Sequence, residues 1–294
     1  MSFFAAEIIS AVKLGSIYSL IAIGYSIVYS IMGLINFAHG ELLMIATYAL
    51  WCLLAAGVPF APAVLIAIAI TVLFGLAMER IAYRPLRDYG EETLVITSLA
   101  VSVFLQSVCQ SIFGPSNKSL VLPEFFSRIH HIGSVNISNM NVIIFVSTIL
   151  LITAVGLTLR YSRLGIAMRA CADNAKAADL MGIDRNRVTV FAFIIGSTLA
   201  ALAGIMYTGE YVSFSPTMGF MLGVKAFIAA VIGGLGSFSG AAVGGFLLGF
   251  LEILFAGYLP EGISSYQTGI VFLVLILLLL VRPSGLFGTN VERS

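Results

Sequence analysis

Three polar side chains of different chemistry lie close together in residues 35–41, Ile-Asn-Phe-Ala-His-Gly-Glu. The amide of Asn36, the imidazole of His39 and the carboxylate of Glu41 stand between two apolar runs, with no Lys or Arg nearby. At membrane depth such groups are costly unless they face a cavity or other protein. Nearby glycines permit a broken helix, which is how many transporters place polar groups near the midplane. The segment is therefore either part of a solute route or a plain turn at the cytoplasmic surface.

Isolated charges also occur inside the apolar runs, at Lys13, Lys225 and Glu252. A lysine at the centre of a span costs about 2.5–3.5 kcal/mol on insertion scales, so Lys225 is not expected to face lipid. It either pairs inside the protein, which we favour, or lines a route as the counter-charge for a carboxylate. Lys13 and Glu252 are expected to lie near a membrane boundary or to extend toward it.

The first apolar run has one face rich in hydroxyl groups. These positions recur at helical spacing and are Ser16, Tyr18, Ser19, Tyr25, Ser26, Tyr29 and Ser30. A span with one hydroxyl face turns that face toward protein or water and its aliphatic face toward lipid. The hydroxyls either line a route or bond to neighbouring helices.

Signals for other chemistry are weak. The nearest approach to a phosphate loop, residues 114–119, lacks the second glycine before its lysine. His130 and His131 are adjacent without further ligand spacing, which indicates solvated loop residues and no metal site. Ser, His and acidic residues form no recognisable hydrolase pattern, and the three cysteines are far apart. We expect neither an enzyme nor a cofactor bound to this chain.

A basic segment, residues 160–187, interrupts the apolar runs and holds six of the fifteen Lys and Arg residues. The spacing of its small and apolar positions predicts a helix over 164–181. Ser162 is a suitable N-cap, and Gly182 suits the residue just past the helix end. An amphipathic helix between two spans offers a surface to a partner outside the membrane, and we interpret that partner as an ATPase.

Charged residues of this predicted helix share a second face. Arg169, Asp173 and Lys176 are three or four residues apart, a spacing that permits ion pairs along a helix. Asp184 follows and can cap the next helix.

The composition sets the protein class. The chain has 294 residues, 60% hydrophobic and 10% charged, whereas soluble domains carry about 25% charged residues. This indicates an all-α, polytopic membrane protein with a single transmembrane domain over 1–294 and eight to ten spans. The net charge of +1 excludes nucleic acid as a natural partner. Runs near the roughly 20 residues that a span needs are 8–31, 42–58, 60–78, 93–113, 142–159, 188–208, 218–235, 238–257 and 266–282.

Lys and Arg in short loops predict the orientation. The 79–92 loop, the basic segment and the tail with Arg282 and Arg293 should be cytoplasmic, whereas 114–141 should face outward. These assignments agree if the N-terminus starts outside.

Glycine patterns suggest an internal repeat and close helix packing. Residues 233–240 repeat the arrangement around 35–41, a span followed by a Gly-containing break with a Phe and then another span. Small residues at every fourth position let helices approach closely, and they are Gly196, Ala200 and Gly204, and Gly236, Gly240 and Gly244. Close packing is the expected role of these residues, and a sliding or gating surface is the alternative.

Four motifs in order carry a resemblance to a known family. They are residues 15–25 (GSIYSLIAIGY), residues 35–41 (INFAHGE), residues 169–174 (RACADN) leading to 180–184 (LMGID), and residues 231–237 (VIGGLGS). Over nearly its full length the chain resembles the smaller permease subunit of the branched-chain amino-acid ABC importers, the LivH-like family.

The resemblance implies a heteromeric importer in the bacterial cytoplasmic (inner) membrane that moves branched-chain or other hydrophobic amino acids inward. Its partners would be a second, related permease, two cytoplasmic ATPases that hold ATP and Mg²⁺, and a periplasmic solute-binding protein. The basic segment would contribute the ATPase-coupling surface, with Arg169, Asp173, Asn174, Lys176, Gly182 and Asp184. The route or its gate would include Ser16, Tyr18, Ser19, Tyr25, Asn36, His39, Glu41 and Lys225.

The sequence is also compatible with other functions. An ABC permease for urea or short amides would have the same architecture, since the binding protein sets much of the selectivity. A stand-alone secondary transporter or channel would work without an ATPase, but its spans would need ionisable groups that are few here. A membrane scaffold would show no solute flux.

Overall fold

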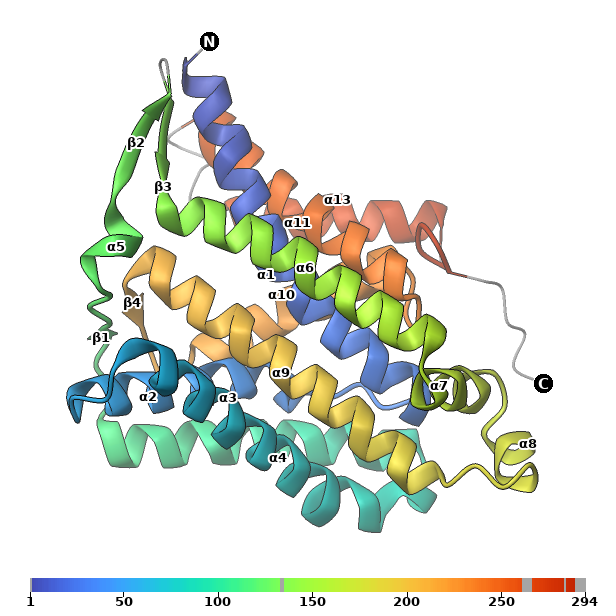
Figure 1. The fold of residues 1–294 in the computed structure, drawn as a ribbon. Helices are drawn as coiled ribbons and strands as arrows, with labels where there is room; N and C mark the ends of the chain where they lie inside the picture. The colour runs from blue at the N-terminus through green and yellow to red at the C-terminus, as the bar shows by residue number, and fades with distance from the viewer. Residues whose placement is uncertain (1, 133–134, 261–265, 283, 289–294) are drawn as a thin grey trace.

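Helices dominate the computed structural model, which describes residues 2–132, 135–260, 266–282 and 284–288 (Figure 1). The α-helices are α1 (Ser2–Met32), α2 (Glu41–Ala55), α3 (Phe60–Ala77), α4 (Glu91–Phe113), α5 (Glu124–Ser127), α6 (Asn139–Tyr161), α7 (Arg163–Asp173), α8 (Ala175–Leu180), α9 (Arg185–Tyr211), α10 (Met218–Gly233), α11 (Phe238–Tyr258) and α13 (Gln267–Val281). Shorter helical turns are the 3₁₀ helices η1 (Phe37–Gly40) and η3 (Arg84–Tyr89) and the π-helix η2 (Met78–Tyr83). The strands are β1 (Lys118–Ser119), β2 (Ile129–Ile132), β3 (Val135–Ser138) and β4 (Ser213–Phe214).

Seven helical segments of the described chain are long and apolar enough to cross a membrane: Phe4–Met32, Phe37–Ala55, Phe60–Arg87, Glu91–Phe113, Asn139–Tyr161, Arg185–Tyr211 and Phe238–Tyr258. Two of the predicted spans correspond to shorter apolar helices, Met218–Gly233 and Thr268–Val281. The prediction of a helical, polytopic membrane protein is confirmed. The predicted count of eight to ten spans is not confirmed by helix length.

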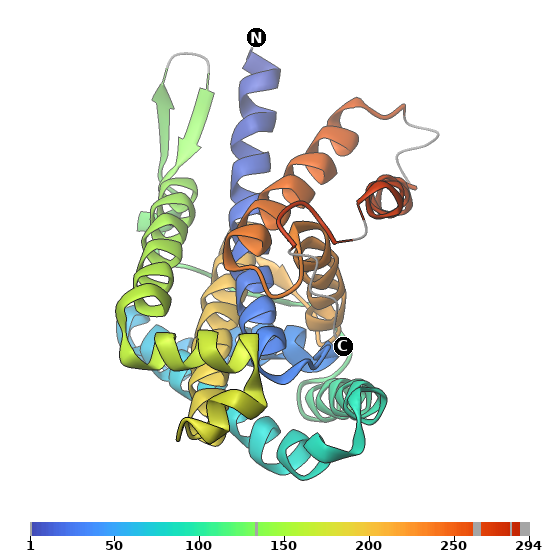
Figure 2. The ribbon, with the colours of Figure 1, turned by 90° about the vertical axis from the view of Figure 1, so that its right-hand side faces the viewer.

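The helix α1 runs through the middle of the bundle, with α6 on one side and α10 and α11 on the other (Figure 2). Glycines make this packing close, as predicted. A Cβ added at Gly196 of α9 would lie 3.2 Å from the carbonyl oxygen of Gly24, and one at Gly204 would lie 2.7 Å from that of Leu43. Side chains at these positions would push the helices apart, so glycine permits the contact.

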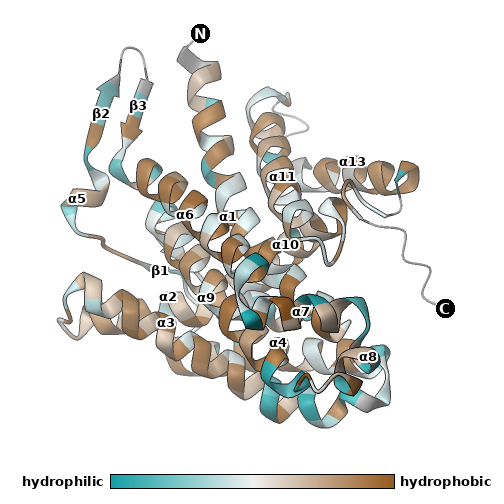
Figure 3. Cartoon of the chain, turned by 45° about the vertical axis from the view of Figure 1, so that its right-hand side comes forward, coloured by the Kyte–Doolittle hydropathy of each residue, from teal (hydrophilic) through white to brown (hydrophobic). Residues whose placement is uncertain are grey.

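The hydrophilic segments gather at the two ends of the bundle, and the helices between them consist mostly of hydrophobic residues (Figure 3). At one end β2 pairs with β3 and β1 pairs with β4, both antiparallel, joining the 114–141 segment to the turn after α9. His130 and His131 are exposed on β2 and bond to nearby Asn side chains, so the prediction of solvated residues is confirmed. The opposite end holds the 79–92 loop, α7, α8 and the start of α9.

Residues 284–288, after α13, also lie at the second end. The N–H of Leu286 donates to the carbonyl of Ile232 at 2.7 Å, so this tail packs on the turn that follows α10. Arg282 belongs to this end, whereas Arg293 lies outside the described residues. The segments predicted to share the cytoplasmic side therefore do lie together.

The predicted single helix over 164–181 is wrong, because the chain breaks at Asn174. Asn174 has an extended backbone with φ −156° and ψ 100°, and its side chain accepts a hydrogen bond from the N–H of Ala177 at 2.9 Å. An asparagine offers the backbone a cap in place of a continued helix. The segment is therefore two helices, α7 and α8. The expected ion pairs are also absent among the described residues, since Arg169 donates to the backbone carbonyl of Arg160 and neither Asp173 nor Lys176 forms an ion pair.

Candidate functional site

The 35–41 segment is a break between two spans that lies inside the protein. Asn36 is 1% exposed and Glu41 0% exposed, so the segment is no plain surface turn. Gly33 begins the break with φ +67°, a conformation that glycine adopts without strain. The Asn36 side chain accepts a hydrogen bond from the N–H of Ala38, which starts η1 before the chain continues as α2. The predicted broken helix is present.

Hydroxyl and amide groups on α4 and η2 bind the polar groups of this break. The Tyr83 hydroxyl donates to the Asn36 side-chain oxygen at 2.8 Å. One carboxylate oxygen of Glu41 accepts from Ser102 at 2.7 Å and from Gln106 at 2.8 Å. Ser102 is the middle residue of the 23-residue helix α4, so Glu41 lies near the mid-depth of the bundle.

Several polar atoms of the break have no hydrogen-bond partner among the described residues. They are the Asn36 amide nitrogen, one ring nitrogen of His39, the second carboxylate oxygen of Glu41 and the Tyr25 hydroxyl. The rings of Tyr25 and His39 are 5.6 Å apart, and His39 lies between Asn36 and Glu41 in the same short break, so we treat these groups as one cluster. Buried polar groups without partners usually mark ordered water or function, which makes the cluster a candidate part of the solute route.

A second polar group joins the middle of α10 to the second half of α11. The ammonium group of Lys225 lies 2.5 Å from a carboxylate oxygen of Glu252, and the Tyr18 hydroxyl donates to the other oxygen at 2.9 Å. The two charged side chains are 14% and 15% exposed. Pairing inside the protein, the interpretation favoured for Lys225, is therefore confirmed. Lys13 pairs with Glu210, one residue from the end of α9, which agrees with its expected place near a membrane boundary, and Glu252 has Lys225 as its partner.

Two of the four serines on the hydroxyl face of α1 bond to the α11 region, and a third, Ser30, bonds to the carbonyl of Ile27 in its own helix. The Ser19 hydroxyl donates to the backbone carbonyl of Ala242 on α11 at 2.6 Å, and Ser26 donates to that of Ser237 at 3.4 Å. Ser16 is buried, and its hydroxyl has no partner among the described residues. The structure thus divides the predicted route residues into the cluster at the break, the charged group at Lys225 and this packed serine face.

At the second end of the bundle the predicted caps are present. Ser162 accepts from the N–H of Gly165 at 2.9 Å, and Asp184 accepts from the N–H groups of Asn186 and Arg187 to begin α9. Gly182 has φ +82°, as expected of a residue just past a helix end. The backbone between α7 and α9 is therefore set by its own capping residues.

Cys171 on α7 points inward and is 3% exposed. Burial raises the pKa of its thiol, Asp179 raises it further and Arg185 opposes the rise. Cys171 therefore packs in the interior of this end of the bundle.

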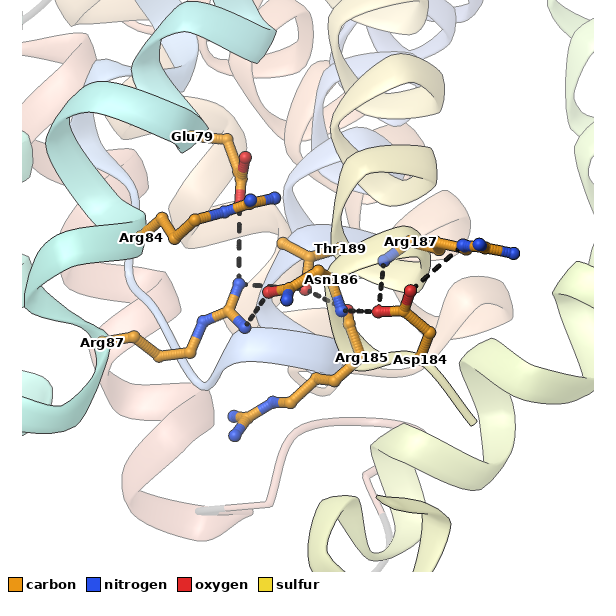
Figure 4. A network of polar contacts seen from close by, with 8 residues as sticks. All are labelled: Glu79, Arg84, Arg87, Asp184, Arg185, Asn186, Arg187 and Thr189. Carbon is orange, nitrogen blue, oxygen red and sulfur yellow. Dashed lines mark hydrogen bonds and ion pairs between the residues drawn. The ribbon is translucent and has the colours of Figure 1, made fainter. Parts of the chain in front are cut away.

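A network of polar contacts joins the 79–92 loop to the start of α9 (Figure 4). Glu79 is almost fully buried and accepts from Arg84 at 3.1 Å and from Arg87 at 3.5 Å. Arg87 also donates to the side chains of Asn186 at 3.2 Å and Thr189 at 3.3 Å. These contacts link the start of α9, just after the α8–α9 turn, to the η2–η3 segment that connects α3 with α4.

Sequence reasoning missed several of these residues. Glu252 and Tyr83 could not be paired with their partners from spacing, because the contacts join distant parts of the chain. The partners of Glu79 are only five and eight residues away, but that spacing does not bring side chains together on a regular helix. The α4 partners did leave a signal, since Ser98, Ser102 and Gln106 recur at every fourth residue and form one polar stripe on an apolar helix.

Comparison with known proteins agrees with this architecture. The sequence matches the family described as branched-chain amino acid transport system / permease component over residues 8–280. The high-affinity branched-chain amino acid transport system permease protein LivH of Escherichia coli K12 is 40% identical, over 97% of this chain and 96% of that protein. The corresponding protein BraD of Pseudomonas aeruginosa is 39% identical over 96% and 95%, and the probable permease LivH of Methanocaldococcus jannaschii is 29% identical over 95% and 91%.

More remote similarity covers only part of the chain. The ribose import permease protein RbsC of Escherichia coli K12 is 35% identical over 41% of this chain and 38% of that protein. No solved structure matches. The full-length matches confirm the resemblance found in the sequence motifs: the chain belongs to the family of branched-chain amino acid transport system permease components.

Proposed function

We propose that this chain is a permease subunit of an ATP-driven importer that moves branched-chain or other hydrophobic amino acids inward across a bacterial cytoplasmic membrane. The observation that carries this proposal is the 40% identity to LivH over 97% of the chain. Its partners would be a second related permease, two cytoplasmic ATPases that bind ATP and Mg²⁺, and a periplasmic binding protein.

In this proposal the spans number nine. The shorter helices α10 and α13 cross as well, which places the N-terminus outside and the basic end of the bundle in the cytoplasm. Two observations support this orientation. The 79–92 loop, the basic segment and the tail lie together at one end of the bundle, opposite the β-strands. Lys and Arg are enriched in loops on the cytoplasmic side of a membrane.

The ATPase would dock on the tip formed by α8 and the turn before α9. Leu180 is 90% exposed and Met181 83% exposed there, beside the exposed charges of Asp173 and Lys176. Apolar side chains exposed next to polar ones are typical of a protein interaction site. Closure of the ATPase pair would then move this tip, and the contacts of Arg87 would carry the motion to α3 and α4.

The solute route would include the charged group at mid-depth. Lys225 and Glu252 offer one positive and one negative group, and an amino acid carries the complementary carboxylate and ammonium. Their partial exposure means that both charges are reachable without unfolding a helix.

The test is reconstitution of the whole complex in sealed vesicles with labelled leucine, urea and acetamide. We expect leucine uptake that requires ATP and the binding protein and persists when ionophores dissipate ion gradients. Uptake by this chain alone, driven by an ion gradient, would instead establish a secondary transporter. Uptake of urea without leucine uptake would assign the amide substrates.

Gly182 provides a specific test of coupling. Its φ of +82° strains any other residue by about 1–2 kcal/mol, although a Cβ there would meet no atom within 4 Å. We expect Gly182→Val to displace the α8 tip, so that ATP hydrolysis continues while uptake falls. Gly57→Val is the matched control, because Gly57 has φ +80° and equally open surroundings in the turn between α2 and α3. Normal uptake per ATP in Gly182→Val would contradict the proposed coupling.

A further inference from the structure

A cavity of about 380 Å³ lies where α7 passes beneath the ends of α1 and α6. The turn between α10 and α11 closes it on the remaining side, with Gly236 and Phe238 in its wall. Figure 2 shows α7 crossing below these helices. A ligand in this cavity would touch both the coupling segment and the spans.

The charge in this cavity is positive. Arg160 and Arg169 line it, together with the hydroxyl-bearing Ser26 and Ser30, and none of its described lining residues is acidic. Within the described chain neither arginine forms an ion pair with a carboxylate. Two guanidinium groups without an anion beside them make a site for an oxyanion, which guanidinium binds through paired N–H groups.

The remaining lining is apolar and consists of Ile27, Leu159, Met168 and Phe238, with small residues between them. A transported amino acid fits this lining poorly, because its ammonium group would meet two positive charges and no carboxylate. An anion with an attached hydrocarbon chain fits both parts of the cavity.

The position of the cavity identifies the source of such an anion. Its walls are the last turns of α1 and α6 and the first turn of α11, which is the level at which spans meet the lipid headgroups. Exposed apolar side chains continue along α6, among them Leu157 and Leu150, where acyl chains would lie.

We propose that this cavity binds the phosphate of an anionic phospholipid from the inner leaflet, with Arg160 and Arg169 as its ligands. The bound lipid bridges the end of α6 to α7 and fixes the coupling segment against α1. The proposal uses the membrane orientation of the proposed function but makes a separate claim about lipid dependence.

The test compares the complete transporter in phosphatidylcholine vesicles that contain increasing fractions of phosphatidylglycerol. Wild-type uptake is expected to rise with the anionic lipid, because the lipid orders the α6–α7 corner. The variant with both Arg160→Gln and Arg169→Gln should lose this rise, which is measured as the ratio of its uptake in anionic lipid to its uptake in neutral lipid. Each arginine near an anionic surface strengthens binding, so the double variant should bind the lipid about thirty-fold more weakly.

The controls separate the site from general surface charge. Arg80→Gln with Arg163→Gln removes the same charge from exposed positions at this end of the bundle that do not line the cavity, and it should keep the lipid response. Arg160→Lys with Arg169→Lys keeps the charge and should restore part of the response. Native mass spectrometry of the purified chain should show one phosphatidylglycerol fewer on the glutamine double variant than on wild type.

Two results would overturn the proposal. One is an equal lipid response and equal lipid retention in wild type and the glutamine double variant. The other is full activation by inorganic phosphate in neutral vesicles, which would assign the site to a soluble oxyanion. Absence of leucine uptake in every lipid would count against the proposed function alone, because the mass spectra still decide whether the lipid binds.

Discussion

Glu252 and Glu41 are both carboxylates within membrane helices, but their surroundings differ. Glu252 has a lysine ammonium group at 2.5 Å and a tyrosine hydroxyl, and it is 15% exposed. Glu41 is fully buried, and its described hydrogen-bond donors are the neutral side chains of Ser102 and Gln106.

The difference separates two roles. A partly exposed Lys–Glu pair carries charges that can exchange partners with a zwitterion, which suits a solute route. A fully buried carboxylate held by neutral donors connects the broken helix to α4, and the bonds to Ser102 and Gln106 do not require a negative charge. We therefore interpret Lys225 and Glu252 as route residues and Glu41 as the side chain that holds the break in place.

The largest effect is expected from breaking the ion pair. Lys225→Met leaves Glu252 without its lysine partner, and removing one partner of a fully buried pair costs about 3–5 kcal/mol, so this partly exposed pair should lose somewhat less. Thermal unfolding of the purified protein in detergent measures this loss. Adding Glu252→Gln should recover most of the stability but should not restore uptake, because both charges are then missing from the route.

Two results would contradict this account of the pair. Stability of Lys225→Met equal to wild type would show that the pair contributes little to folding. Solute affinity and transport rate equal to wild type in the same variant would remove Lys225 from the route.

A smaller effect is expected where α10 approaches Glu41. A Cβ on Gly219 would lie 2.6 Å from the second carboxylate oxygen of Glu41 and 2.6 Å from the carbonyl oxygen of Gly40. Gly219→Ala should therefore destabilise the protein by about 1–3 kcal/mol through overpacking. The control is Gly269→Ala on α13, where a Cβ meets nothing within 4 Å. Equal unfolding temperatures for the two variants would refute the close contact.

The smallest effect is expected from Glu41→Gln. An amide oxygen can accept the same two hydrogen bonds from Ser102 and Gln106, so the loss should stay below about 1 kcal/mol. Glu41→Leu leaves both donors without an acceptor and should cost about 1–3 kcal/mol. If Glu41→Gln destabilises the protein as much as Glu41→Leu does, the negative charge of Glu41 is itself required. Glu41 would then resemble Glu252 in depending on its charge.

The sequence predicts the helical class, the spans and the break at 35–41, because these depend on local periodicity and on the cost of polar groups among apolar ones. It also locates Ser162, Gly182 and Asp184 as boundary residues, since capping is a local property. The family follows from four motifs in order. These features need no knowledge of which helices touch.

Contacts between residues far apart in the chain could not be predicted from local patterns. Lys13 lies 197 residues from Glu210 in the chain, and only the packing of α1 against α9 brings them together. The break at Asn174 was missed for a different reason: the apolar spacing continues through 164–181, but the cap at Asn174 competes locally with a continuous helix. Whether the second glycine-rich turn reflects an internal repeat stays a prediction, although Gly33 and Gly234 both have positive φ.

The central claim is that the α8 tip faces the cytoplasm and binds the ATPase. Leu180→Cys in a variant without the native cysteines would place one exposed thiol on this tip, and Val121→Cys, at an 84% exposed position, would mark the opposite end. With a membrane-impermeant maleimide, the thiol introduced by Leu180→Cys should be labelled in inside-out vesicles only, and bound ATPase should protect it. Labelling of this thiol in intact right-side-out vesicles would show that the α8 tip faces the exterior.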